Sequence, residues 1–176
     1  MRKNLKRNWL TLFAISCFFF LLYGCGYHLV GTGNNLPAHI KTISIPVFKN
    51  TSSQPEIHRQ LTSAILQSFI SDGRLKIAKK EDADLVMNGT LSYYNKRAVS
   101  FNSQDLVADF IIEIEVELKI IDQIKGKVFL KKKLKNQWDY KSNNDIAETE
   151  TARLEALDQA YIDLGNRIVS LIIDQF

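Results

Sequence analysis

Cysteine is scarce in this chain of 176 residues, which contains only Cys17 and Cys25. Both lie near the N-terminus, so the sequence after residue 25 has no thiol pair for a disulfide bond or a thiolate-ligated metal. The stability of that part must therefore come from a hydrophobic core. Its roughly 150 residues are rich in Ile, Leu, Val and Phe, which is enough for one domain that buries most of the surface its unfolded chain exposes.

Histidine is also rare, and the three present are His28, His39 and His58. Metal sites and nucleophile–base pairs need convergent side chains, whereas these three are scattered without metal-ligand spacing. Gly31-Thr32-Gly33 lacks the strand, the lysine and the helix of a phosphate-binding loop. We therefore predict no catalytic residue, no metal site and no cofactor, and a protein that is not an enzyme.

An excess of positive charge is absent once the first 24 residues are set aside. The formal net charge of +4 equals the contribution of the four basic residues at positions 2–7, and no acidic residue precedes residue 25. The remaining sequence has 19 Asp and Glu and the same number of Lys and Arg. An overall basic surface for nucleic acid is thereby excluded, and any charged partner must be recognised by a local patch.

The N-terminal segment has the pattern of a bacterial lipoprotein signal peptide. Basic residues are followed by an apolar run, Trp9–Tyr23, that is shorter than the roughly 20 residues needed to span a bilayer. Gly24 is a compact residue that lets a peptidase reach the bond before Cys25, whose thiol would carry the lipid. By analogy with sorting in enteric bacteria, Gly26 rather than Asp directly after Cys25 favours the outer membrane. The alternatives are an uncleaved signal anchor or a chance Gly-Cys pair. We predict a signal peptide over 1–24, a lipid on Cys25, a flexible tether over 25–40 and a folded domain over 41–176.

Hydrophobic periodicity in the domain predicts an α+β fold. A helix after Pro55 carries apolar residues at four-residue spacing, and a long helix follows the capping residue Asp145. Between and before the helices, alternating patterns predict strands near 43–47, 75–77, 85–93, 110–120 and 128–138. We expect a two-layer sandwich in which two helices pack on a mostly antiparallel sheet of four to five strands, with one sheet face open.

Two predicted strands carry charges that complement each other. If residue 121 faces residue 127, Glu117, Glu115 and Glu113 lie opposite Lys131, Lys133 and Lys135. Such opposed pairs contribute about 0.2–1 kcal/mol each and specify the register. The basic run is therefore interpreted mainly as a cross-strand ladder, with an anion-binding patch as the alternative.

Several motifs together resemble the lipopolysaccharide-assembly LptE family. Cys25-Gly26-Tyr27-His28-Leu29 followed by Gly31 is similar to the start of its mature lipoproteins. The strand-like segment 43–50, the helix after Pro55, Asp82-Ala83-Asp84-Leu85-Val86 with Gly89, and the long final helix follow the family's order across nearly the whole mature chain. Each motif alone is weak, and their common order carries the resemblance.

The resemblance implies a lipid-anchored, periplasm-facing outer-membrane lipoprotein. It would sit partly inside the β-barrel LptD, assist the assembly of that barrel and help to deliver lipopolysaccharide to the outer leaflet. Clustered basic residues suit phosphorylated lipid A, so Lys96, Arg97, Lys131 and Lys133 are candidate lipopolysaccharide contacts, with Lys96 and Arg97 near an expected loop. Alternatives are a secretin pilot, a barrel-assembly accessory or a lipid-anchored periplasmic hydrolase.

Overall fold

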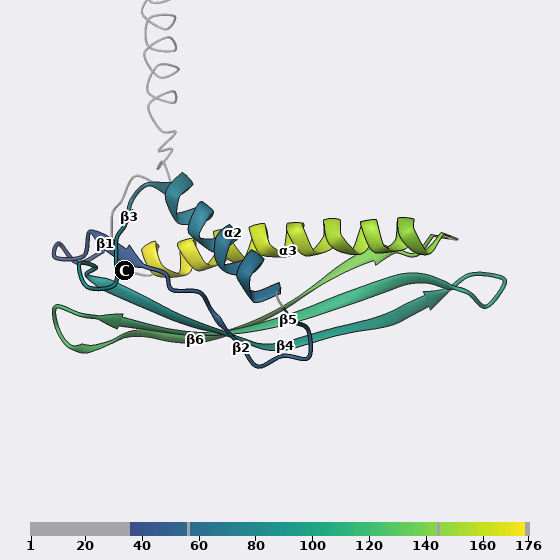
Figure 1. Cartoon of the computed structure of the whole chain (residues 1–176), viewed down its shortest axis with the longest axis horizontal. Coiled ribbons are helices and arrows are strands. Elements are labelled where there is room, and N and C mark those ends of the chain that lie inside the picture. Colours follow the sequence, from purple (N-terminus) through teal and green to yellow (C-terminus); the bar gives the residue numbers. More distant parts are fainter. Residues whose placement is uncertain (1–35, 56, 144, 175–176) are drawn as a thin grey trace, which may run out of the picture. The chain divides into compact units, whose positions relative to one another are not determined.

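The computed structural model describes residues 36–55, 57–143 and 145–174. The predicted signal peptide, Cys25 and most of the predicted tether lie outside these residues. The described elements are β1 (Thr42–Ser44), β2 (Lys49–Asn50), α2 (Ile57–Asp72), β3 (Lys76–Ile77), β4 (Leu85–Phe101), β5 (Val107–Asp122), β6 (Lys127–Lys141) and α3 (Ile146–Ile173). The two helices lie together on one side of a sheet (Figure 1).

The helices begin where the sequence signals predict, and α2 ends at a glycine. The carboxylate of Asp145 accepts a hydrogen bond from the backbone N–H of Ala147 at 2.7 Å and so caps the start of α3. Gly73 follows α2 with a φ of 74°, and its N–H donates to the carbonyl of Phe69. The four-residue spacing in α2 becomes a buried stripe consisting of Ile57, Leu61, Ile65 and Phe69. These predictions from capping and periodicity are confirmed.

The sheet has six strands, and the predicted α+β class is confirmed with a more mixed sheet than expected. β4, β5 and β6 form an antiparallel meander, whereas β1 pairs in parallel with β3 and β4, and β2 pairs in parallel with β4. The parallel strands have only two or three residues each, which is too few for the sequence to show the direction in which they pair. The strands predicted near 43–47 and 75–77 correspond to β1 and β3, whereas β2 was missed and the parallel pairing was not expected.

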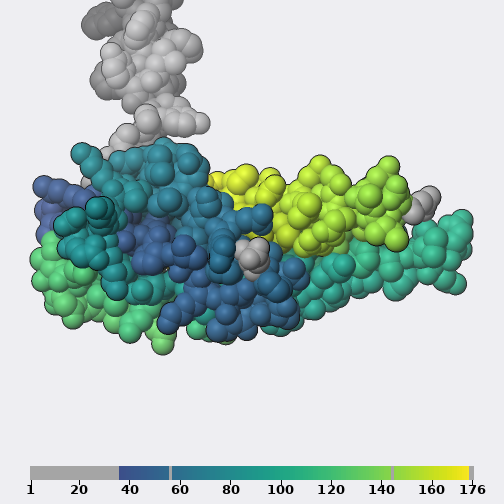
Figure 2. All heavy atoms as spheres, in the orientation of Figure 1, coloured from purple at the N-terminus to yellow at the C-terminus, as the bar shows by residue number. Residues whose placement is uncertain are grey.

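The two faces of the sheet differ in polarity. Ile112, Ile114, Val116, Leu118 and Ile120 of β5 are almost fully buried beneath the helices. The alternating residues of the same strand are charged or partly exposed and form the other side, which we call the open face. Figure 2 shows α2 and α3 packed along the strands, with the β4–β5 turn extending past the start of α3. The open face therefore presents polar groups to solvent.

Two carboxylates fasten the beginning of the domain to the sheet. Asp84 accepts hydrogen bonds from the backbone N–H groups of Lys41 and Thr42 at 2.8 and 2.9 Å. Burial opposes ionisation of Asp84, but these N–H groups and the neighbouring hydroxyl outweigh it and lower its pKa. Asp122, 2% exposed, pairs with His39 at 2.9 Å in the same region. Folded structure thus reaches the last residues of the predicted tether, where Leu36 and Ile40 are buried.

Candidate functional site

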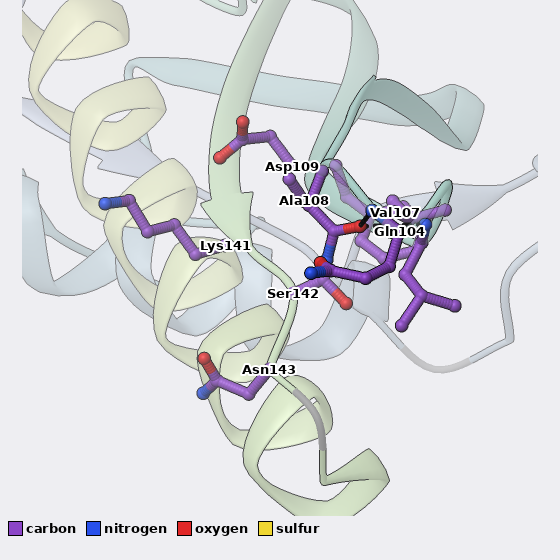
Figure 3. A pocket seen from close by; sticks show the side chains of 10 residues that line it. Gln104, Val107, Ala108, Asp109, Lys141, Ser142 and Asn143 are labelled. Atoms are coloured by element: carbon purple, nitrogen blue, oxygen red, sulfur yellow. Dashed lines mark hydrogen bonds between the residues drawn. The ribbon is translucent and has the colours of Figure 1, made fainter.

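An open cleft of about 1080 Å³ lies at the end of the sheet where the β4–β5 turn meets the end of β6. Figure 3 shows Gln104, Asp109, Lys141 and Asn143 around this distal cleft, each from a different part of that junction. The backbone N–H of Ser142 donates to the carbonyl of Ala108 at 2.8 Å, which joins the end of β6 to β5. The lining offers amides, one ammonium group and one carboxylate for polar contacts.

The turn beside the distal cleft is shaped by its own side chains. The side-chain oxygen of Asn102 accepts hydrogen bonds from the N–H groups of Gln104 and Leu106 at 2.9 and 3.0 Å. The turn exposes apolar groups, because Phe101 is 63% and Leu106 57% exposed. The cleft thus combines a polar lining with an apolar rim and holds no nucleophile–base pair in the described residues.

Lys96 and Arg97 lie within β4, so the prediction that they sit near a loop is wrong. β4 continues to Phe101, eight residues beyond the alternation recognised in the sequence, because β-bulges near Ser92 and Val99 interrupt its parity. Lys96 pairs with Ile112 and therefore lies on the helix-covered face, with its Nζ 5.3 Å from the centre of the Phe110 ring. Lys96 is thus partly engaged in a cation–π contact.

Arg97 lies on the opposite side of the sheet from Lys96, since successive strand residues alternate between faces. Its Nη2 is 3.9 Å from Oε1 of Glu113 on the open face, and the side chain is 48% exposed. The two neighbours in sequence therefore cannot form one compact patch. Any ligand that contacts both would have to reach around the edge of β4.

Lys133 belongs to the predicted ladder, although the predicted pairs are wrong by two residues. In the structure Glu117 faces Lys133 and Glu115 faces Lys135. The pair next to the turn is Asp122 with Lys127, which shifts the predicted register by one residue, and a bulge at Phe129 shifts it by a second residue. A shift of one residue would move the side chains to the other face of the sheet, but a total shift of two residues leaves the charged side chains on the open face. The Nζ of Lys133 lies 2.9 Å from Glu115 and 3.3 Å from Glu117.

This ladder is held by direct hydrogen bonds. Lys133 and the hydroxyl of Ser92, which donates to Glu115 at 2.8 Å, together lower the pKa of Glu115. The side chain of Lys135 lies over the ring of Tyr93 at 5.0 Å. The lysines at 133 and 135 thus have partners on their own sheet, which supports a structural role for this part of the basic run.

Lys131 has a different environment from Lys133. It lies directly opposite Lys119, a pairing that the predicted register did not anticipate. Both border a second cleft of about 370 Å³ on the open face, together with Lys49 from β2. Lys49 and Lys119 were not among the candidate residues from the sequence, because their proximity depends on the parallel β2–β4 pairing and on the bulge in β6.

Metal ligation finds no support among residues 36–55, 57–143 and 145–174, where no group of three or more His, Cys, Asp or Glu could hold an ion. His39 pairs with Asp122, and His58 lies on α2, whereas His28 is outside the described residues. Within the same part of the chain, no helix combines the length and apolar character needed to cross a bilayer.

The fold matches solved structures of bacterial lipoproteins. Rare lipoprotein B from Shewanella oneidensis is 17% identical, with a TM-score of 0.55 over 73% of this chain and 94% of that one. A minor lipoprotein from Acinetobacter baumannii is 16% identical, with a TM-score of 0.54 over 79% and 95% of the two chains. Lipoprotein B from Nitrosomonas europaea is 14% identical, with a TM-score of 0.54 over 83% and 92%. These likenesses establish a shared fold.

The sequence itself matches a family model. No curated protein sequence matches the chain, but residues 40–172 match the model described as LptE, lipopolysaccharide-assembly. That range runs from the start of the sheet to the last turns of α3 and includes both clefts. The resemblance drawn from the motifs is confirmed, and the chain belongs to the lipopolysaccharide-assembly LptE family.

Proposed function

We propose that the protein is an outer-membrane lipoprotein, anchored by lipid on Cys25 and facing the periplasm, that forms a plug-and-barrel complex with an LptD-type β-barrel. In this role it assists assembly of the barrel and delivery of lipopolysaccharide to the outer leaflet, without catalytic turnover. The observation that carries the proposal is the family match over residues 40–172. The role itself comes to this chain from the family.

The open face of the sheet supports such a complex physically. The interiors of outer-membrane barrels are polar, so a plug inside one must present hydrogen-bonding and charged side chains. The open face does so through the ladder of Glu115, Glu117 and Lys133. The apolar core is meanwhile covered by α2 and α3. A surface of this kind can lie against a wet barrel wall without burying an unpaired apolar patch.

Depletion of the protein in its native host tests this function. We expect the amount of correctly folded LptD-type barrel in the outer membrane to fall, together with lipopolysaccharide at the cell surface. Other barrels in the same membrane are the internal control. If the protein were a secretin pilot, secretin assembly would fail instead, and a general barrel-assembly accessory would lower several barrels together.

The lipopolysaccharide contacts are proposed at Lys96, Arg97, Lys131 and Lys133. Because Lys96 and Arg97 lie on opposite faces, they should be tested as the single variants Lys96→Ala and Arg97→Ala. We expect one of the two to weaken lipopolysaccharide binding by about tenfold, which corresponds to one lost charge-assisted hydrogen bond. The binding of the full-length protein in detergent can be measured by titration. Unchanged affinity in both variants would remove this pair.

A further inference from the structure

The β5–β6 turn and the loop before β4 form one surface at an end of the sheet. The side-chain amide of Gln123 in the turn donates from Nε2 to the carbonyls of Lys80 and Ala83 at 2.7 and 2.6 Å. Figure 1 shows the β5–β6 turn at the same end of the sheet as β1, and the β4–β5 turn at the other end. We call residues 79–82 and 123–127 the proximal tip.

The predicted lipid attachment at Cys25 belongs to this end of the domain. Asp122, directly before the turn, pairs with His39 at 2.9 Å, so the first described residues are fixed beside the proximal tip. Ten residues separate Cys25 from the buried Leu36, and such a segment spans at most about 40 Å. The β4–β5 turn lies farther away by the length of β4, whose 17 residues rise about 3.3 Å each. The chain therefore holds the proximal tip, rather than the β4–β5 turn, close to the attached bilayer.

The proximal tip presents apolar side chains that the core does not bury. Ile124 in the turn is 58% exposed, and Val128 just beyond it is 51% exposed. A single exposed apolar residue is common and by itself needs no ligand. The turn is well defined, however, since Asp122 accepts a hydrogen bond from the N–H of Lys125 at 2.9 Å and Gly126 adopts a φ of 62°. A fixed turn loses little conformational freedom when Ile124 enters an apolar environment.

Lysines surround the apolar residues of the proximal tip. Its exposed charged residues are four lysines and two carboxylates, an excess of two positive charges: Lys79, Lys80, Lys125, Lys127, Glu81 and Asp82. Lysine stems can lie along an apolar boundary while their ammonium groups stay among polar headgroups. Lysines close to an anionic membrane surface are also attracted to it. An apolar apex with flanking lysines therefore fits the surface of a phospholipid bilayer.

We propose that the proximal tip docks on the bilayer that holds the acylated Cys25. Ile124 enters the boundary between headgroups and acyl chains, and Lys125 and Lys127 contact anionic headgroups. The inference rests on the proposed lipid on Cys25 and adds a second contact, made by the folded domain. Two signals anchor a protein more stably than one. Docking occupies the proximal tip alone and leaves the open face and the distal cleft available to other partners.

Fluorescence quenching in vesicles tests this contact. The variant Ile124→Cys is made in the full-length chain in its native host and labelled with a thiol-reactive bimane. The new cysteine is the single free thiol, because Cys25 carries the proposed lipid and Cys17 lies in the predicted signal peptide. The purified protein is reconstituted into vesicles of phosphatidylethanolamine and phosphatidylglycerol with brominated acyl chains, which quench a label that reaches them.

The matched control is Leu106→Cys, because Leu106 is 57% exposed in the β4–β5 turn at the other end of the sheet. We expect strong quenching of the label at position 124 and little at position 106. Thermal unfolding should be the same for both labelled proteins, since both replaced side chains are exposed. If Ile124→Cys impairs folding, Val128→Cys places the label beside the same turn and should also be quenched.

A lysine variant tests the electrostatic part of the contact. With the label at position 124, Lys127→Gln should lower the ratio of docked to free turn by about fivefold, the equivalent of about 1 kcal/mol for a lysine at an anionic surface. Lys141→Gln, at the other end of β6, is the control and should leave the ratio unchanged. An unchanged ratio in Lys127→Gln would remove this lysine from the contact.

Equal quenching at positions 124 and 106, or none at position 124, would overturn the docking. Quenching that disappears when the density of protein in the vesicles is reduced would also overturn it, because the tip would then contact a second copy of the chain. Mass spectrometry of the same preparation separates the two possible failures. Acylated protein with an unquenched label would refute the docking alone, whereas absence of a lipid on Cys25 would refute the anchor and the docking together.

Discussion

Replacing Gly89 by alanine is expected to lower the free energy of unfolding by about 1–3 kcal/mol, the usual cost of overpacking a filled core. A Cβ added at Gly89 would lie 2.3 Å from the ring of Phe48. That ring cannot withdraw easily, because Phe48 is 2% exposed and its N–H donates to the hydroxyl of Thr62 at 3.0 Å. Urea unfolding followed by circular dichroism should show the loss as a lower midpoint with an unchanged slope.

A second substitution shows whether the clash with Phe48 is the cause. In the Phe48→Leu background, where the ring is absent, Gly89→Ala should cost less than in the unmodified protein, so the two changes should not be additive. Gly126→Ala is a useful comparison, since its φ of 62° strains a side chain although no atom lies within 4 Å of the added Cβ. Equal midpoints for Gly89→Ala and the unmodified protein would contradict this packing.

Replacing Cys25 by alanine is expected to release the protein from the membrane. Each buried CH₂ contributes about 0.8 kcal/mol, and two or more acyl chains are needed for stable anchoring, so loss of the acylated residue removes the attachment almost completely. The prediction rests on the sequence pattern of residues 2–25, which lies outside the described structure. Fractionation of native host cells should show at least about a tenfold drop in the membrane-bound share.

Cys17→Ala is the matched control for this experiment, because Cys17 lies inside the apolar run of the predicted signal peptide. It should leave fractionation unchanged. Mass spectrometry of the unmodified protein should find a lipid mass on an N-terminal Cys25. An intact N-terminal methionine, or a Cys25→Ala variant that stays with the membrane, would disprove the anchor.

The parts of the fold that the sequence predicted are those with long, regular patterns. α3 repeats its apolar stripe over 28 residues and begins at a capping aspartate, and β5 alternates over 16 residues. Such signals persist whatever the neighbouring elements do. The short strands β1 and β3 were indicated by the apolar patterns near residues 43–47 and 75–77. The two-residue strand β2 and the parallel pairing of all three depend on partners far along the chain, which are β4 for β1 and β2, and β1 for β3, so they could not be recognised locally.

For the candidate site residues too, the sequence predicted what depends on local pattern and missed what depends on tertiary pairing. The sequence placed Lys133 correctly in a ladder with glutamates, since that required only the strand parity. It could not place the exact register, which depends on the pairing of Asp122 with Lys127 next to the turn and on a bulge at Phe129. The separation of Lys96 from Arg97 was missed because the predicted strand ended near residue 93, whereas β4 continues to Phe101. The meeting of Lys49 with Lys119 and Lys131 was missed because it follows from tertiary pairing.

The complex with an LptD-type barrel is the central claim, and affinity purification tests it most directly. The protein, tagged at its C-terminus and expressed in its native host, is extracted from membranes in mild detergent and purified. We predict that one large outer-membrane β-barrel is recovered with it in nearly equal amount, and that mass spectrometry identifies this barrel as LptD-type. Recovery of a secretin or of the general barrel-assembly machinery in its place, or of the lipoprotein alone, would contradict the account.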